Sequence, residues 1–367
     1  MARSARPRRE ASRSRTRLGV DIDPLLASAY AFHLPEALIA QHPIEPRDAA
    51  RLMVVGSGAP EHHTFHKLPA LLRLDDLLVL NETRVIRARL HGRREPSGGA
   101  CEVFLLHPDG SAAQHWAALV RPAKKLPVGA RVRFADGSLA EVTAAGEEGE
   151  RSVTLHLTQP LEAFLREIGS VPLPPYVHEP VPEEDYQTVY ARVEGSVAAP
   201  TAGLHFTPEL LAALEARGIE TARLVLDVGL GTFRPMTGER LDQHRMHAER
   251  YTIPRSCVES IARAKSAGRR VVAVGTTTLR ALEGCVHDHG ALDAVSDETS
   301  IFITPGFRFA VVDALVTNFH LPRSTLLVLV SAFAGRERIL RAYTEAVAAG
   351  YRFYSFGDAM LLSRATE

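Results

Sequence analysis

Apolar positions in much of the chain either recur every three to four residues or form short continuous runs. The first pattern is typical of helices that pack on one face, and the second of buried strands. Helices are predicted at residues 208–217, 254–267, 279–283, 325–334 and 337–349. Strands are predicted at residues 51–55, 77–80, 222–228, 271–274, 301–303, 311–316 and 351–354. Strands and helices that follow one another in this way indicate an α/β domain.

Between Arg87 and Thr158 the pattern changes to short strands, separated by Gly, Pro, Asp or Ser, without an intervening helix. These strands are predicted at residues 87–90, 101–106, 115–120, 130–134, 140–143 and 151–157. Six short strands predict a small antiparallel β-barrel inserted between two halves of an α/β domain. We therefore predict an α/β fold class: a mixed-sheet main domain at 20–86 and 159–367, with the barrel at 87–158.

Polar side chains stand where several predicted strands end, the usual place for ligand contacts in an α/β sheet. At one such exit, Gly275 precedes a helix start whose free N–H groups suit a carboxylate or a phosphate. Capped turns and an ordinary helix cap explain the same residues, so both interpretations stay open. The candidate substrate-binding residues are Asn81, Arg84, Thr201, Arg234, Thr276, Thr277, Asn318, His320 and Asp358.

The segment 195–206 combines small residues with Pro200, Thr201 and His205, directly before a helix. Small residues leave the backbone open to a ligand, and the imidazole titrates near neutral pH. A buried loop packed under the helix is the alternative. His244 and His247 stand three residues apart, a spacing that could bind metal on a helix. Because the segment offers no evident third ligand, we expect no metal.

Composition and charge narrow the protein class. The chain is 46% hydrophobic without an apolar run of membrane-spanning length, so we expect no membrane contact. Three widely spaced cysteines without a CxxC pair fit a reducing cytoplasm. The formal net charge of +0 argues against a generally basic nucleic-acid coat. Basic residues nevertheless crowd one barrel loop and the following strand, where solvated charge and phosphate contact are both open: Arg121, Lys124, Lys125, Arg131 and Arg133.

The first nineteen residues carry seven arginines and one glutamate, a local charge of +6. With almost nothing apolar to bury, residues 1–19 predict a disordered basic tail. An organelle transit peptide, a start codon assigned too early and weak electrostatic help in holding RNA are alternatives.

Read in order, several segments resemble those of the S-adenosylmethionine:tRNA ribosyltransferase-isomerase family, which acts in queuosine biosynthesis. Residues 198–206, 318–322 and 351–360 together carry most of the resemblance, which covers almost everything from Leu34 to the C-terminus. The similar segments are 34–51, 81–90, 173–206, 228–246, 271–283, 301–335 and 351–361.

The resemblance implies an α/β domain with an inserted β-barrel, acting on tRNA that carries 7-aminomethyl-7-deazaguanine at the wobble position. It implies transfer and isomerisation of the ribosyl group of S-adenosylmethionine, giving epoxyqueuosine-tRNA with release of adenine and methionine. S-adenosylmethionine is then a consumed substrate and no separate cofactor is implied. We expect a cytoplasmic monomer.

The implied reaction needs a base that takes a proton beside the sulfonium group. We rank His205 first and His244 second as catalytic residues, because an imidazole is neutral near pH 7. Asp227 is the third candidate. It stands where the family usually has histidine, Arg87 replaces a common proline, and Ala29-Tyr30-Ala31 lacks a usual Asp-Phe pair.

Two other functions remain in competition. An S-adenosylmethionine-dependent tRNA methyltransferase needs an early glycine-rich loop, whereas the glycine loop at Gly229 comes late and is incomplete. A non-catalytic tRNA-binding protein needs no polar strand ends. Release of free adenine distinguishes the ribosyltransferase from both.

Overall fold

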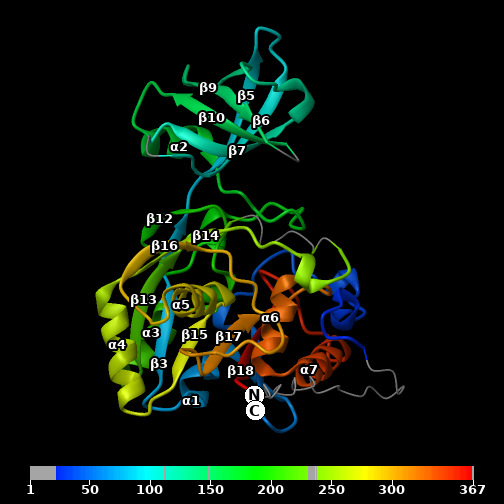
Figure 1. Cartoon of the computed structure of the whole chain (residues 1–367), viewed down its shortest axis with the longest axis vertical. Coiled ribbons are helices and arrows are strands. Elements are labelled where there is room, and N and C mark those ends of the chain that lie inside the picture. The colour runs from blue at the N-terminus through cyan, green and yellow to red at the C-terminus, as the bar shows by residue number, and fades with distance from the viewer. Residues whose placement is uncertain (1–21, 111–112, 147–148, 230–235, 237, 366–367) are drawn as a thin grey trace, which may run out of the picture.

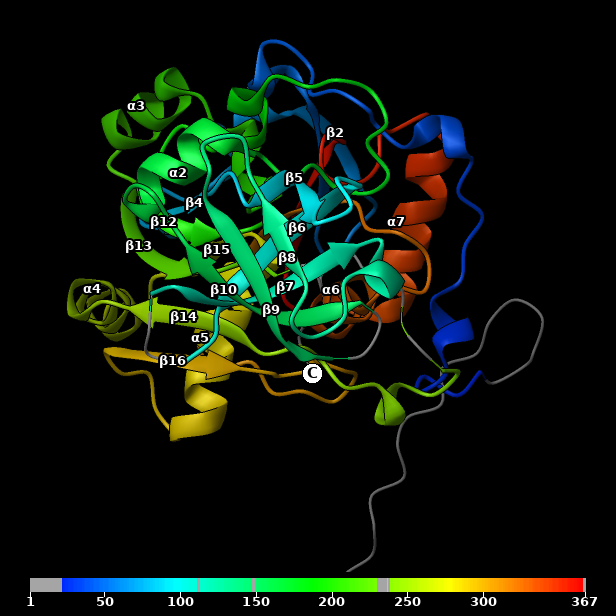
Figure 2. The same cartoon turned by 90° about the horizontal axis from the view of Figure 1, so that it is seen from above.

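The computed structural model describes residues 22–110, 113–146, 149–229, 236 and 238–365. The predicted tail at 1–19 and the candidate Arg234 therefore lie outside the described residues. Figure 1 shows two parts, a β-barrel above a larger main domain. Seen from above, the barrel covers the middle of the main domain (Figure 2).

A nine-stranded mixed sheet forms the centre of the main domain. Its strands in spatial order are β16 (Val295–Thr299), β14 (Glu249–Ile253), β13 (Glu220–Leu226), β3 (Leu77–Asn81), β15 (Val271–Val274), β17 (Ala314–Asn318), β18 (Ala359–Ser363), β1 (Arg51–Val55) and β2 (Glu61–Thr64). The four central strands β13, β3, β15 and β17 run parallel to one another. Because β3 precedes the barrel and β13 follows it, one sheet is built from both halves of the chain.

Both faces of this sheet are buried, which explains why the central strands are continuously apolar. Leu77 and Val79 of β3 contact the core under α4 (Arg255–Ser266), α5 (Thr276–His289), α6 (Thr325–Ala334) and α7 (Arg336–Ala348). Leu78 and Leu80 point to the other core, with α1 (Leu68–Leu71) and α3 (Pro208–Ala216). Successive residues of a strand point to opposite faces, so one strand serves both layers.

The inserted part is a closed, six-stranded antiparallel barrel. Its strands are β5 (Arg89–Glu95), β6 (Ala100–Pro108), β7 (His115–Arg121), β8 (Arg131–Arg133), β9 (Leu139–Ala145) and β10 (Glu150–His156), and pairing of β5 with β8 closes it. Each of the six overlaps a predicted strand, although β5 shares only Arg89 and Leu90 with the strand predicted at 87–90. The next helix, α2 (Leu161–Ile168), packs on the barrel core, where the ring centroids of Phe164 and Phe134 are 5.3 Å apart.

Two short pairings connect the barrel to the main domain. β4 (Thr83–Val85) pairs in parallel with β12 (Val193–Ser196), and β11 (Gly169–Ser170) pairs with β5. At Gly169 a side-chain Cβ would lie 1.9 Å from the carbonyl oxygen of Arg87. Only glycine allows the entering and leaving segments to approach this closely.

Three strand predictions were wrong in position. Residues 301–303 and 351–354 form no strand, and the final strand is β18 at Ala359–Ser363. Phe353 is buried by ring packing and makes only an isolated bridge to Ile39, so its apolar neighbourhood reflects burial, not sheet pairing. β17 begins at Ala314, because the backbone N–H groups of Val311 and Val312 donate to Glu283 instead of to a neighbouring strand.

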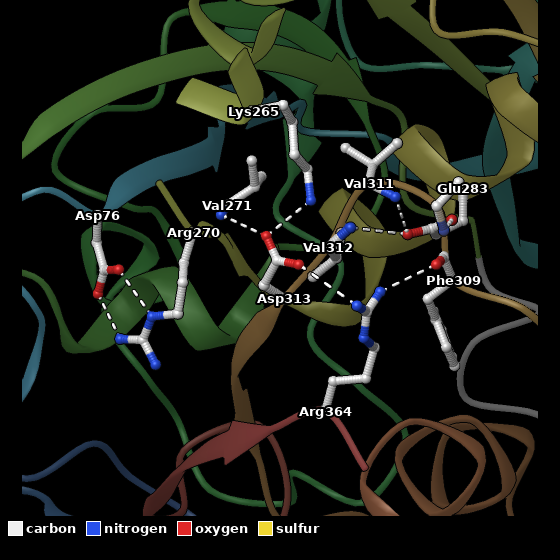
Figure 3. Close-up of polar contacts among 11 residues, drawn as sticks. Asp76, Lys265, Arg270, Val271, Glu283, Phe309, Val311, Val312, Asp313 and Arg364 are labelled. Carbon is white, nitrogen blue, oxygen red and sulfur yellow. Dashed lines mark hydrogen bonds and ion pairs between the residues drawn. The ribbon is translucent and has the colours of Figure 1, made fainter. Parts of the chain in front are cut away.

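At the amino ends of β15 and β17, the carboxylates of Asp76 and Asp313 fix the loops (Figure 3). Asp76 accepts two hydrogen bonds from the Arg270 guanidinium, at 2.8 and 2.6 Å. Asp313 accepts from Lys265 and from the backbone N–H of Val271, at 2.7 and 2.9 Å. These contacts set the start of β15 and β17, whose opposite ends carry the candidate site.

Candidate functional site

The ends of several central strands surround a small pocket of about 40 Å³, here called the strand-end pocket. Five predicted residues line it: Thr201, Thr276, Thr277, Asn318 and His320. Gly275 adopts φ 92°, which favours glycine, and turns the chain from β15 directly into α5. The first turn of α5 therefore faces the pocket beside the end of β17.

Asn318 is the centre of a buried hydrogen-bond network. Its Oδ1 accepts from the Thr201 hydroxyl at 3.1 Å, and its Nδ2 donates to Nε2 of His205 at 3.2 Å. A further hydrogen bond joins His205 to the backbone of Arg47, and burial lowers the pKa of His205 to about 4. His205 is thus a neutral imidazole whose contacts orient Asn318, an arrangement that favours a positioning role.

His320 has a different environment. Its Nε2 contacts the Thr317 hydroxyl at 3.0 Å, and burial lowers its pKa to about 3. Its backbone N–H donates to the hydroxyl of Tyr343 at 2.9 Å. A neutral imidazole at the pocket wall can donate or accept a hydrogen bond to a ligand without bringing charge.

We expect acid to destabilise the protein through these two histidines. Both pKa values lie below the unfolded value of 6.5, so the stabilisation is complete above pH 6.5 and is lost as pH falls toward 4. At pH 4.5 each histidine should cost about 2–3 kcal/mol of unfolding free energy. Urea unfolding at pH 7 and 4.5 should show a smaller acid loss for the His205→Gln/His320→Gln variant than for wild type. The exposed His66→Gln control should retain the wild-type loss; equal losses in all three proteins would contradict the assignment.

Asn81 joins two strands behind the pocket. Its amide donates to the carbonyl of Leu226 at 2.9 Å, and its oxygen accepts from the N–H groups of Leu226 and Thr83, at 3.0 and 3.1 Å. Its Nδ2 lies 3.5 Å from the hydroxyl of pocket residue Thr277. These bonds give Asn81 a structural role, whereas we predicted that it contacts the substrate.

A larger cavity, about 600 Å³, lies between the barrel and the main domain and is here called the interdomain cleft. Asp227 lines it directly after β13 and accepts a hydrogen bond from the Thr83 hydroxyl at 3.2 Å. Burial raises the pKa of Asp227 above its usual range. A Cβ at Gly195 would lie 2.7 Å from Asp227 Oδ1, so a larger residue here would displace this carboxylate.

The cleft and the strand-end pocket are adjacent, because Val228 lines both. The hydroxyl of Ser196 accepts from the N–H of Val228 at 2.8 Å and donates to the carbonyl of Ala198 at 2.7 Å. The small-residue segment 195–206 thus both packs tightly and borders the two cavities. At Gly203 a Cβ would lie 2.1 Å from the hydroxyl of Tyr190, which shows the packing role.

Three predicted residues lie outside this arrangement. Arg84 is exposed, and its guanidinium is 3.4 Å from the carbonyl of Ala191. Asp358 is buried, where its carboxylate accepts from the backbone N–H groups of Arg51 and Arg352, at 2.9 and 2.8 Å. His244 packs against Phe302 with centroids 5.4 Å apart, and burial lowers its pKa. None of the three lines either cavity as the structure describes them.

The chain matches a known protein family over most of its length. The model of a family described as "Queuosine biosynthesis protein" matches residues 27–362. The chain belongs to this family. Two relatives, from Symbiobacterium thermophilum and Thermus thermophilus, are each 53% identical to this chain and are named S-adenosylmethionine:tRNA ribosyltransferase-isomerase. Each alignment covers 91% of this chain, with 99% and 98% of the relatives respectively.

A solved structure agrees with this assignment. The crystal structure of S-adenosylmethionine tRNA ribosyltransferase from Thermotoga maritima is 37% identical, with a TM-score of 0.52. The match covers 91% of this chain and 99% of that chain. As a member of the queuosine biosynthesis family, the chain is an enzyme of the transferase class. Within the described residues, no helix has the length and apolar character needed to cross a membrane.

Sequence reasoning missed several residues that line the cleft of this family member. Trp116 reaches it from the barrel, while Glu249 and Arg250 come from β14. Glu249 forms a buried ion pair with Arg280 of α5, and its Oε1 accepts from the N–H of Gly229 at 3.3 Å. His244 and His247 have a spacing that could bind metal, although we expected none there. Among the described residues, no group of three or more His, Cys, Asp or Glu could hold a metal.

Proposed function

We propose that the protein transfers and isomerises the ribosyl group of S-adenosylmethionine onto 7-aminomethyl-7-deazaguanine at the wobble position of tRNA. The product is epoxyqueuosine-tRNA, with adenine and methionine released. The observation that carries this proposal is the interdomain cleft beside the strand-end pocket in a member of the queuosine biosynthesis family. The names of the relatives supply S-adenosylmethionine and tRNA as substrates.

The cleft has the size and the charge for such substrates. Its volume of about 600 Å³ exceeds the 40 Å³ of the strand-end pocket, so of these two cavities the cleft is the one with room for a nucleoside or a base turned out of the tRNA. Carboxylates of Asp227 and Glu194 line it. They suit two cationic groups, the sulfonium of S-adenosylmethionine and the aminomethyl group of the modified base.

Asp227 is our preferred proton acceptor. The sulfonium charge acidifies the neighbouring 5′-carbon, and a base that removes this proton starts the loss of adenine and then of methionine. A carboxylate with a raised pKa is a stronger base than an ordinary aspartate. His205 and His320, with pKa values lowered to about 4 and 3, are weaker bases than ordinary histidines. They fit orientation and hydrogen bonding better.

S-adenosylmethionine is a consumed substrate in this scheme, and the proposal includes no separate cofactor. Asn318, Thr201 and the first turn of α5 border the strand-end pocket, where hydroxyl, amide and N–H groups can orient part of the bound nucleoside. His205 keeps the Asn318 amide in place. Proton transfer is thus assigned to the cleft and orientation to the pocket.

The reaction products test the function. Purified protein incubated with S-adenosylmethionine and precursor-bearing tRNA should release free adenine and methionine in equal amounts with epoxyqueuosine formation. Methyl transfer would instead give S-adenosylhomocysteine, and simple tRNA binding would give no product. Either result would reject the proposal. tRNA that lacks the aminomethyl base serves as the control and should give no adenine above background.

A further inference from the structure

A basic groove occupies the end of the barrel that is farthest from the main domain. Arg93, Arg94 and Glu95 of β5 line it together with Arg131 and Arg133 of β8, around a volume of about 520 Å³. We call it the barrel-end groove. Strand β5 runs from Arg89, near the connection to the main domain, to Glu95 at the groove, roughly 20 Å at 3.3 Å per residue. Figure 1 shows β5 extending away from the main domain.

Two lysines extend the charge of this groove. Arg94 donates from Nη1 to the carbonyl of Lys125 at 3.0 Å, which places the turn with Lys124 and Lys125 beside it. Arg94 Nε also donates to the Ser97 hydroxyl at 2.9 Å, and Arg93 donates to the carbonyl of Gly98 at 3.1 Å. The two arginines are therefore held in place by neutral groups, which leave their charge uncompensated.

Only part of the positive charge is paired. Arg133 forms an ion pair with Glu95 at 2.5 Å, and Arg131 with Glu141 at 3.3 Å. Within the described chain, the four other cations form no ion pair: Arg93, Arg94, Lys124 and Lys125. Lys124, Lys125 and Arg93 each keep part of their surface open to solvent.

The strand register makes this clustering costly. Arg93 and Arg133 are directly opposite one another in the β5–β8 pair, so two basic residues occupy paired positions across the strands. Like charges in this arrangement destabilise a sheet. Neither side chain contributes to the barrel core, which consists of apolar residues. The ion pair with Glu95 offsets this cost for Arg133 but not for Arg93. Binding of a polyanion would account for the charge that stays unpaired.

We propose that the barrel-end groove, with Lys124 and Lys125, binds the phosphate backbone of the tRNA. The proposal rests on the proposed function for the identity of the RNA. Guanidinium groups form bidentate hydrogen bonds with phosphate oxygens, and the lysine ammonium groups add positive charge. Because the groove is distant from the interdomain cleft, the RNA phosphates that it binds lie far from the modified base. Such binding positions the RNA without reading its sequence.

The test is the salt dependence of tRNA binding. We expect the Arg93→Gln/Arg94→Gln/Lys124→Gln/Lys125→Gln variant to bind precursor-bearing tRNA roughly 10- to 1,000-fold more weakly than wild type at physiological salt. The slope of log K against log salt should become shallower by roughly 0.7–0.9 for each phosphate group that the variant no longer neutralises. Affinity for S-adenosylmethionine alone should not change, because the groove is separate from the cleft.

A matched control removes four arginines of the main domain that form no ion pair within the described chain: Arg73, Arg217, Arg255 and Arg341. All four are exposed. The Gln variant of these four should keep the wild-type slope. If the groove and control variants lose equal affinity, net charge and not the groove explains binding, and the proposal is overturned. Single Gln variants, each with a smaller slope change, cover the case in which the quadruple variant fails to fold.

The outcomes separate this proposal from the proposed function. A wild-type protein that binds tRNA with the groove-dependent slope but releases no adenine supports the groove and rejects the reaction. Normal adenine release with an unchanged slope in the groove variant supports the reaction and rejects the groove. Wild-type protein that binds no tRNA rejects both.

Discussion

An Asp227→Asn variant is expected to release adenine roughly two to four orders of magnitude more slowly than wild type, the usual contribution of general acid–base catalysis. Asparagine keeps the size of the side chain and can still accept the Thr83 hydrogen bond, but it cannot take a proton. Binding of tRNA and of S-adenosylmethionine should change far less than turnover. Single-turnover adenine release, with each ligand's affinity measured separately, distinguishes these effects.

The same substitution should make the folded protein more stable near neutral pH. Burial raises the folded pKa of Asp227 above its unfolded value, so the folded state holds the proton more tightly. The resulting stability is present at low pH and is lost as pH rises through the folded pKa. Removing the ionisable group removes this loss, so unfolding of Asp227→Asn should require more denaturant at pH 7 than unfolding of wild type.

Two further observations make this prediction specific. The acid limb of the wild-type rate profile should lie above the usual aspartate pKa of 3.8, because burial raises the value. Glu298→Gln is the matched control, since Glu298 also lines the cleft but forms an ion pair with Arg250 at 2.9 Å. That variant should keep turnover within a few-fold of wild type. Near wild-type turnover by Asp227→Asn would show that Asp227 is not the base, and His205 and His244 would then be the remaining candidates.

Local sequence pattern was sufficient for the central strands and the barrel. β15 is a run of four apolar residues followed by Gly275 and a helix, so both its burial and its end are visible in the sequence. The edge strand β16 and its neighbour β14 were missed, because their sequences, VSDET and ERYTI, place charged residues at exposed positions. A strand with one exposed face alternates polar and apolar residues and therefore shows no continuous apolar run.

The site was predictable where strand order brings residues together. Thr276 follows β15 and Asn318 ends the neighbouring parallel strand β17, so their presence at one pocket follows from α/β topology. Trp116 and Asp227 meet only because the barrel lies over the main domain, which no local pattern indicates. The hydrogen bonds of Asp358 could not be predicted from local sequence either, because its partner Arg51 is 307 positions away.

Replacement of Glu283 is expected to give the largest loss of stability. This side chain of α5 is 1% exposed, and its carboxylate accepts from the backbone N–H groups of Ala310, Val311 and Val312, at 2.8, 3.0 and 2.9 Å. Figure 3 shows the contacts with Val311 and Val312. Glu283→Ala leaves three N–H groups without their acceptor, at about 1–3 kcal/mol for each one that stays buried. We expect a total loss of about 3–6 kcal/mol in the free energy of unfolding.

Urea unfolding at pH 7 measures this loss of unfolding free energy. Two further variants test whether the lost hydrogen bonds cause it. Glu283→Gln keeps one acceptor oxygen but turns an NH₂ group toward an N–H donor, so its loss should be smaller than that of Glu283→Ala. Glu259→Ala, on the exposed side of α4, should change stability by less than about 0.5 kcal/mol. Glu283 joins α5, which begins at the pocket, to the segment before β17, which ends at Asn318. A folded Glu283→Gln protein should therefore also bind S-adenosylmethionine more weakly; wild-type stability in both Glu283 variants would show that the three N–H groups find other partners.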